Sequence, residues 1–222
     1  GQSRGFDPNA NGYAADGVYT TGSGGGGSGN NGPSYIGGQG ASGFVAIRYR
    51  MPSASASAKA TGGDISFYDS KVIHTFLTSG TFVTPGSFSE TCEYVVIGGG
   101  GGSTNTNGGG GAGLYRTGTM PIGSSVTSTV TIGYGGNGQP KTNYSTNPTG
   151  SRGFTGGTTT FAHPTTPIVS PGGGYGSGGH PTQPWSPGGA GGSGGGGSDW
   201  AGGARPGGTA TGVAFPGTIG AT

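Results

Sequence analysis

Charged residues are scarce in this sequence. Asp, Glu, Lys and Arg make up only 7% of its 222 residues, against roughly a quarter in an average globular domain. The nine basic residues are scattered singly and the formal net charge is only +2. Nothing resembles a basic patch with interleaved aromatic residues, so we expect no nucleic-acid partner.

Reactive side chains are also few. The single cysteine, Cys92, allows no internal disulfide, and its position in an alternating run predicts a small buried apolar side chain. The three histidines, His74, His163 and His180, have no second His, Cys or acid at metal-ligand spacing. The acids are mostly isolated, and no Gly-x-Ser-x-Gly elbow is present. We therefore expect a protein that is not an enzyme, with no metal and no cofactor.

Long apolar runs and helical periodicity are missing too. No run approaches transmembrane length, so we expect no membrane insertion. Hydrophobic residues make up 28% of the chain, and Ala, Leu, Glu and Lys almost never recur at helical spacing over ten residues. The fold is therefore expected to contain essentially no α-helix.

Glycine is what the chain has in abundance: 60 residues, beside 15 prolines. Left-handed polyproline II helices have three residues per turn and no internal hydrogen bonds, so they are stable only beside others that accept and donate. Residues 188–196 read GGA, GGS, GGG, and Gly37, Gly40 and Gly43 keep the same period. Without side chains on the touching faces such helices can approach closely, which predicts a bundle of short polyglycine II rods.

One glycine motif has a competing interpretation. The stretch GYGGNG at 133–138 formally matches the dinucleotide fingerprint and follows a predicted strand. The residues after it, Gln139, Pro140 and Lys141, cannot open the helix that the fingerprint requires. In so glycine-rich a chain the match is expected by chance.

Alternating apolar residues predict a small antiparallel sheet, with strands at 44–50, 71–77, 81–84, 93–97 and 125–132. The segments 71–77 and 81–84 are expected to form a hairpin. The fold class is therefore all-β, a small antiparallel sheet combined with short polyglycine/polyproline II helices.

Two short sequences occur twice in the same order, SRGF at 3–6 and 151–154, and SGGGGS at 23–28 and 193–198. They predict three parts: 1–51 as the closing part of one glycine-rich module, 52–64 as a Ser/Ala-rich linker, and 65–222 as a second module. Within the second module we expect strands at about 66–135 and rods and loops at about 98–113 and 172–212. The second copy then lacks its own closing strand.

Aromatic and polar residues set among glycines near rod ends are the candidate glycan contacts. They are Tyr175, His180, Trp185, Trp200 and Arg205. Aromatic faces beside hydrogen-bond donors suit sugar rings, and loops on a rigid scaffold are where binding is usually found. The alternative is that the two tryptophans simply cover the side of a rod bundle.

The run from His74 to Gly138, with HTFLTSGTFVTPG, EYVVIGGGGG, GGGGAGLYRTG and VTSTVTIGYGGNG in this order, resembles the glycine-rich domain of bacteriophage tail fibres and tail-associated proteins. The stretch GGQGASGFVAIRYR at 37–50 is similar to the closing strand of such a domain. The later rods also resemble the polyglycine II bundles of phage tail-tip adhesins. The resemblance implies an extracellular or virion fibre protein that contacts cell-surface carbohydrate of a host, or a structural spacer.

Two other functions fit the same features. One is a self-assembling extracellular filament, in which each unit is completed by strand addition from its neighbour. The assembly strand would then be Phe44, Val45, Ala46, Ile47, Arg48, Tyr49 and Arg50, and the partners would be copies of the chain or other fibre subunits. A less favoured alternative is an ice-binding rod bundle that presents a flat, ordered polar face.

Overall fold

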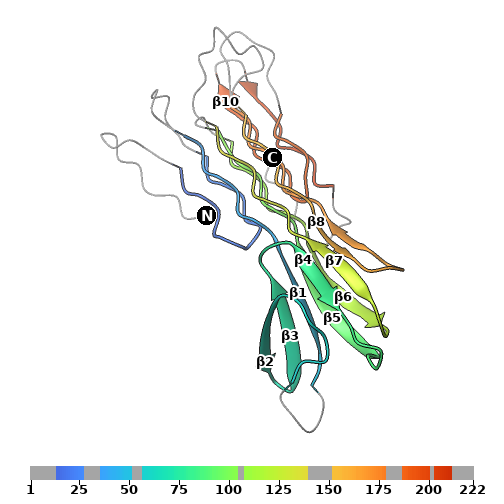
Figure 1. The fold of residues 1–222 in the computed structure, drawn as a ribbon. Coiled ribbons are helices and arrows are strands. Elements are labelled where there is room, and N and C mark those ends of the chain that lie inside the picture. The colour runs from blue at the N-terminus through green and yellow to red at the C-terminus, as the bar shows by residue number, and fades with distance from the viewer. Residues whose placement is uncertain are drawn as a thin grey trace.

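The computed structural model describes residues 14–27, 36–51, 57–104, 108–139, 152–178, 187–200 and 203–211. These residues form an elongated body with a β-sandwich at one end and a bundle of extended, largely unpleated segments at the other (Figure 1). No helix occurs within the described ranges. The fold is therefore all-β, as the sequence predicts.

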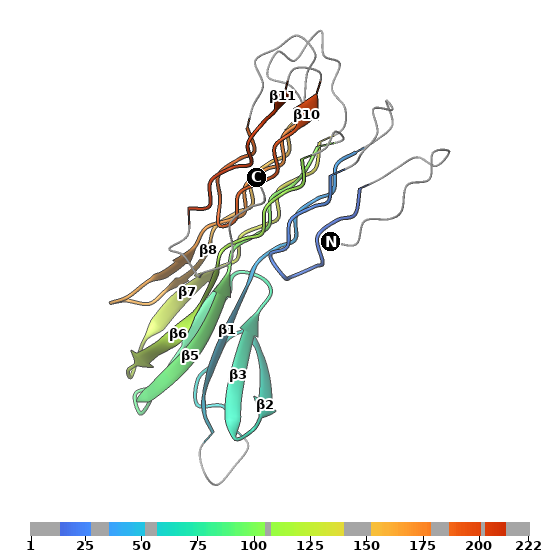
Figure 2. The same ribbon diagram turned by 180° about the vertical axis from the view of Figure 1, so that it is seen from behind.

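The sandwich consists of two antiparallel sheets. The larger has the order β2-β3-β1-β5-β6, from β1 (Phe44–Arg50), β2 (Asp64–Tyr68), β3 (Lys71–Phe76), β5 (Glu90–Ile97) and β6 (Tyr115–Ile122). The smaller has the order β4-β7-β8-β9, from β4 (Gly80–Val83), β7 (Thr127–Thr131), β8 (Thr159–Ala162) and β9 (Ile168–Ser170). A short pair, β10 (Asp199–Trp200) and β11 (Gly203–Ala204), lies at the bundle end (Figure 2).

The core lies between the two sheets and is rich in aromatic rings. Alternate residues are buried along strands such as β1, β3 and β7, which is the period-two pattern of a sheet with one buried face. Phe82 of the smaller sheet contacts Phe161 and also His74 of the larger sheet edge-on, with ring centroids 6.1 and 5.1 Å apart. Cys92 is buried and free, as its alternating position predicts.

The predicted hairpin is wrong, although both of its strands exist. β3 pairs with β1 and β2, whereas β4 pairs with β7 in the other sheet. The turn Leu77–Ser79 therefore carries the chain from one sheet to the other. Sequence alternation marks each strand as half-buried but contains no information on which sheet it joins.

The segment Phe44–Arg50, the candidate assembly strand, occupies the centre of the larger sheet. It pairs on one side with β3, from Val45–Phe76 to Arg50–Lys71, and on the other with β5, from Phe44–Ile97 to Arg48–Glu93. Both of its hydrogen-bonding edges are thus used within its own chain. Residues 14–51 and 57–211 consequently share one sheet and one bundle in their described parts.

Eleven extended segments of the described chain form the bundle, and we call them rods. They are rod 1 (14–18), rod 2 (22–27), rod 3 (36–43), rod 4 (98–104), rod 5 (108–114), rod 6 (133–139), rod 7 (152–158), rod 8 (171–178), rod 9 (187–191), rod 10 (193–198) and rod 11 (205–211). Rods 3, 5 and 7 lead into β1, β6 and β8, and rods 4, 6 and 8 follow β5, β7 and β9. Successive rods therefore alternate in direction.

Rod 4 is the axis of the bundle. Its amides donate to three neighbouring rods in turn, with a period of three residues and N···O distances of 2.8 to 3.1 Å. Gly98 and Gly101 donate to rod 5, Gly99 and Gly102 to rod 7, and Gly100 and Ser103 to rod 3. Its carbonyls accept amides from rods 2, 6 and 8. Rod 4 thus donates in three directions and accepts from three directions, which matches the three residues per turn of polyglycine II.

No side chain fits on the glycines of rod 4. A Cβ added to any of Gly98 to Gly102 would lie 2.0 to 2.2 Å from a carbonyl oxygen of a neighbouring rod. Rods at the edge of the bundle have fewer neighbours, and side chains reappear there at the open positions. Five consecutive glycines therefore mark the rod that is surrounded on all sides.

Gly101→Ala is expected to destabilise the fold strongly, by about 3 kcal/mol or more, because the methyl group would push rods 4 and 8 apart and break hydrogen bonds. The matched control is Gly109→Ala on rod 5, where the nearest atom to an added Cβ is 3.5 Å away. That variant should be neutral or gain about 0.5 kcal/mol from reduced freedom of the unfolded chain. Urea unfolding of both variants measures the difference; equal effects would contradict the close packing of rod 4.

A buried polar network joins the core to the chain that follows β1. His74 is fully buried, its Nδ1 lies 2.7 Å from the carbonyl oxygen of Gly62, and its Nε2 lies 3.2 Å from the hydroxyl of Tyr49. The Tyr49 hydroxyl also accepts the amide N–H of Ala60 at 2.9 Å. The arrangement fits a neutral imidazole that donates through Nδ1 and accepts through Nε2. Burial lowers the pKa of His74 from its usual value of 6.5.

Stability should consequently fall on acidification. A histidine whose pKa is lowered by folding stabilises the protein above the unfolded value, about 6.5, and this contribution is lost as the pH falls toward the folded value. Urea unfolding between about pH 7 and about pH 5 should show this loss. His74→Phe should be less stable at neutral pH but have a flatter pH profile. His163→Phe is made separately as a control, because His163 is also buried with a lowered pKa. If the free energy of unfolding of His74→Phe falls with pH as steeply as that of the wild type, the loss of stability does not come from His74.

Candidate functional site

The predicted glycan contacts are only partly within the described chain. His180 and Trp185 lie outside it. Trp200 belongs to β10 and pairs with Gly203. Tyr175 is in rod 8, and Arg205 begins rod 11, where its amide donates to the carbonyl oxygen of Ser198 at 3.0 Å.

Tyr175 is held inside the bundle surface rather than presented as an open ring. It is half-buried, and the guanidinium carbon of Arg152 lies 5.4 Å from the ring centroid. The ring also contacts Gly189, where an added Cβ would be 2.4 Å from a ring carbon. Rod 9 separates it from Arg205, because Gly189 bonds to Tyr175 and Gly188 bonds to Pro206. The structure thus places Tyr175 and Arg205 on different rods.

The described thiol and imidazole groups are buried. Burial raises the pKa of Cys92 to about 12, so its thiol is protonated at neutral pH. His74 and His163 are held in the core or at its edge with lowered pKa values. No group of three or more His, Cys, Asp or Glu residues in the described part of the chain could hold a metal ion. The described chain also contains no helix that is long and apolar enough to cross a membrane.

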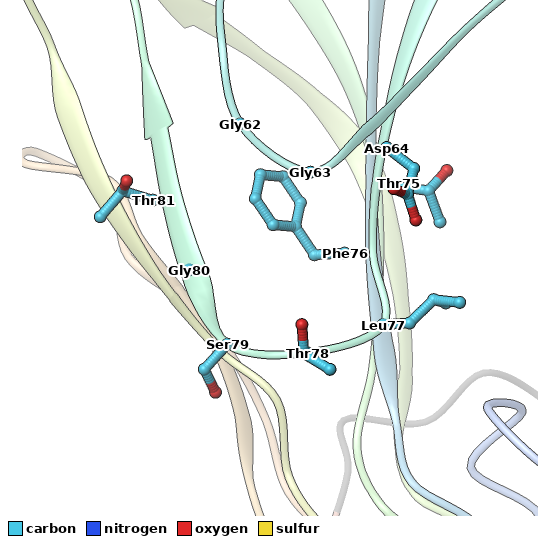
Figure 3. Close-up of a pocket in the computed structure, with 10 residues that line it drawn as sticks. All are labelled: Gly62, Gly63, Asp64, Thr75, Phe76, Leu77, Thr78, Ser79, Gly80 and Thr81. Carbon is cyan, nitrogen blue, oxygen red and sulfur yellow. The ribbon is translucent and has the colours of Figure 1, made fainter.

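Two hollows flank the turn Leu77–Ser79, where the sandwich meets the bundle. The first, which we call the sheet cleft, has a volume of about 380 Å³ and lies between the end of β3, the start of β4 and the turn at Gly62 and Gly63. Figure 3 shows Phe76 pointing into the space between that turn and Gly80, with Leu77 pointing away. Gly62 and Gly63 have positive φ angles of 109° and 65°, which glycine adopts readily.

The second hollow, which we call the junction groove, is larger, with a volume of about 700 Å³. Its floor is formed by rod 3, its sides by rods 1 and 6 and by the turn at 19–22, and its end by the turn Leu77–Ser79. Exposed rings, amides and hydroxyls line it, among them Tyr19, Tyr134, Gln39, Asn137 and Thr78. No Lys, Arg or His of the described chain is part of this lining.

Sequence reasoning missed the junction groove, although a signal was present. In rod 3, Ile36, Gln39 and Ser42 recur every third residue between glycines or Ala41, and in rod 6, Tyr134 and Asn137 do the same. A side chain at every third position of a polyglycine II rod marks the one face that has no neighbouring rod. The three-residue period does not show which rods lie side by side.

Comparison with known proteins supports the glycine-rich character of the chain. A family model described as a glycine-rich domain matches residues 77–222. No curated protein and no solved structure matches the chain significantly. Strands β1, β2 and β3 precede the matched region and complete the larger sheet. Because the match spans more than half of its length, the chain belongs to the glycine-rich domain family.

Proposed function

We propose that the protein is a non-enzymatic structural and adhesive component of an extracellular or virion fibre, such as a phage tail fibre or adhesin, which contacts host-surface glycans. The observation that supports this most is the hydrogen-bonded rod bundle. Each inner rod is bonded to several neighbours, so the bundle resists bending and shear without needing a large apolar core. Such a body is suited to holding recognition surfaces at a fixed distance from an anchoring domain.

The arrangement of the rod ends fits an adhesive role. Rods 2, 4, 6, 8 and 10 all run away from the sandwich, and the next rod or strand returns from the same pole (Figures 1 and 2). The described ends of these rods therefore lie together at the end of the body opposite the sandwich. Residues on such connections can vary in sequence while the rods stay the same, which is how rigid scaffolds usually present binding residues.

Fluorescently labelled protein should bind bacterial surface polysaccharides. The probes are a printed panel of purified lipopolysaccharides, capsular polysaccharides and teichoic acids, with intact bacteria as a second substrate. Binding by the folded chain to at least one probe, and its loss after heat unfolding, is the expected result. A folded chain that binds none of these polysaccharides and no cells would contradict the adhesive function.

Self-assembly is a second candidate, and the edge strand β2 favours it. All five residues of β2 are exposed, including Ile65, Phe67 and Tyr68. Ile65 and Phe67 lie opposite His74 and Val72, which point into the core, so the apolar face of β2 extends beyond the smaller sheet. An edge strand without Pro or Lys and with exposed apolar residues is a template for pairing with another chain.

Phe67→Lys should abolish any association through this edge, because it places a charge on the apolar face of the exposed strand. Sedimentation velocity at rising protein concentration measures the effect. Thr119→Lys on β6, the opposite edge of the same sheet, is the control and should leave association unchanged. A wild-type chain that stays monomeric at all concentrations would rule out the filament.

A further inference from the structure

The junction groove has a regular construction that distinguishes it from an incidental hollow. Rod 3 lies between rods 1 and 6: Gly17 donates to the carbonyl oxygen of Gln39 at 2.7 Å, and Gly40 donates to that of Gly136 at 2.9 Å. Side chains on the open face recur every third residue, one turn of the rod or about 9 Å. Rod 3 thus forms a floor bounded by rods 1 and 6, with side chains set at fixed intervals along it.

Two tyrosines stand at the sides of this floor. Tyr19 and Tyr134 line the groove and are 81% and 82% exposed. Rings this exposed can stack flat against a ligand in the groove and exclude water from the shared face. One turn along rod 6 from Tyr134 is Asn137, so a ring and an amide share one face at a spacing comparable to two linked sugar units.

The groove is uncharged apart from one carboxylate that is already engaged. Asp16 Oδ1 accepts the amide N–H of Gln39 at 2.7 Å and so ties rod 1 to rod 3. The remaining polar groups of the lining are amides and hydroxyls, which both donate and accept. With no cation of the described chain in the lining, an anionic ligand would have no counter-charge. Flat rings with amides and hydroxyls between them match a neutral carbohydrate chain.

We propose that the junction groove binds a neutral oligosaccharide, with Tyr19 and Tyr134 as stacking platforms and Asn137 and Gln39 as hydrogen-bonding partners of the sugar hydroxyls. This inference rests on the adhesive function proposed above and names the site and ligand class for it. It assigns recognition to residues at the junction with the sandwich, none of which is among the candidate contacts Tyr175, His180, Trp185, Trp200 and Arg205.

The groove is held in shape before any ligand arrives. The turn that bears Tyr19 is fixed by hydroxyls: the amide of Val18 donates to Ser23 Oγ at 2.8 Å, and Thr21 Oγ1 donates to the carbonyl oxygen of Val18 at 2.6 Å. Rods 3 and 6 are in close contact, since a Cβ on Gly135 would lie 1.8 Å from the carbonyl oxygen of Gly40. Because both rings are carried by such fixed segments, binding costs little ordering of the protein.

The test uses the full chain on an array of neutral oligosaccharides built from hexoses and N-acetylhexosamines, printed beside sialylated and sulfated ones. Titration calorimetry with each glycan that is bound gives the affinity. Tyr19→Ser and Tyr134→Ser should each weaken binding about tenfold, a loss of about 1.4 kcal/mol. The matched control is Tyr68→Ser on β2, a tyrosine that is 75% exposed and lies outside the groove.

Three results would overturn the inference, and they can be told apart. Undiminished binding in the Tyr19→Ser/Tyr134→Ser double variant removes the groove as the site but leaves the adhesive function standing. A preference for sialylated or sulfated glycans contradicts the neutral ligand. Absence of binding to every glycan and polysaccharide tested contradicts both this site and the adhesive function. Thermal unfolding of the double variant, expected to match wild type because both side chains are exposed, excludes misfolding.

Discussion

The structure depends on how the buried backbone of rod 4 is satisfied. The amides from Gly98 to Ser103 and the carbonyls from Gly99 to Ser103 all bond to neighbouring rods, and the amides turn to three rods in a sequence that repeats every three residues. A hydrogen bond contributes a net of about 1 kcal/mol, whereas ordering one residue's backbone costs about 1–2 kcal/mol, and more for glycine. Hydrogen bonding alone therefore leaves the rods marginal. Something else has to fix their number, spacing and direction.

The sandwich provides that constraint. Six rods are direct continuations of strands, so the sheets set where each rod begins and which way it runs. Neighbouring strands lie about 4.8 Å apart, close enough for the rods that continue from them to bond directly. The aromatic core around Phe82, Phe161 and His74 contributes the apolar burial that the glycine rods lack. The two halves are thus interdependent, and β1 links them because rod 3 runs directly into it.

Much of this organisation could be predicted from the sequence, and the remainder shows what a local pattern leaves open. Periods of two and three identified β1, β3, β7 and the rods within 37–43, 98–113 and 172–211, but not rods 1 and 7. β6 was missed because Gly118 and Pro121 interrupt its alternation, although both lie within the pairing with β5. The hairpin was misassigned because alternation does not specify a partner. The junction groove was not predicted, because Tyr19 and Tyr134 are over a hundred residues apart in the sequence and come together only through rod 3.

The bundle separates positions that maintain the fold from positions that are free to serve recognition. On rod 4 no residue from Gly98 to Gly102 can change, because each Cβ position is occupied by a neighbouring carbonyl. On rods 3 and 6, one residue in three faces solvent, and Gln39, Tyr134 and Asn137 occupy such positions. A substitution there alters the surface without affecting a rod-to-rod hydrogen bond, since those bonds are made by backbone atoms. A glycine lattice can therefore carry different ligand preferences at constant fold, provided that the residues between the variable positions remain glycine or alanine.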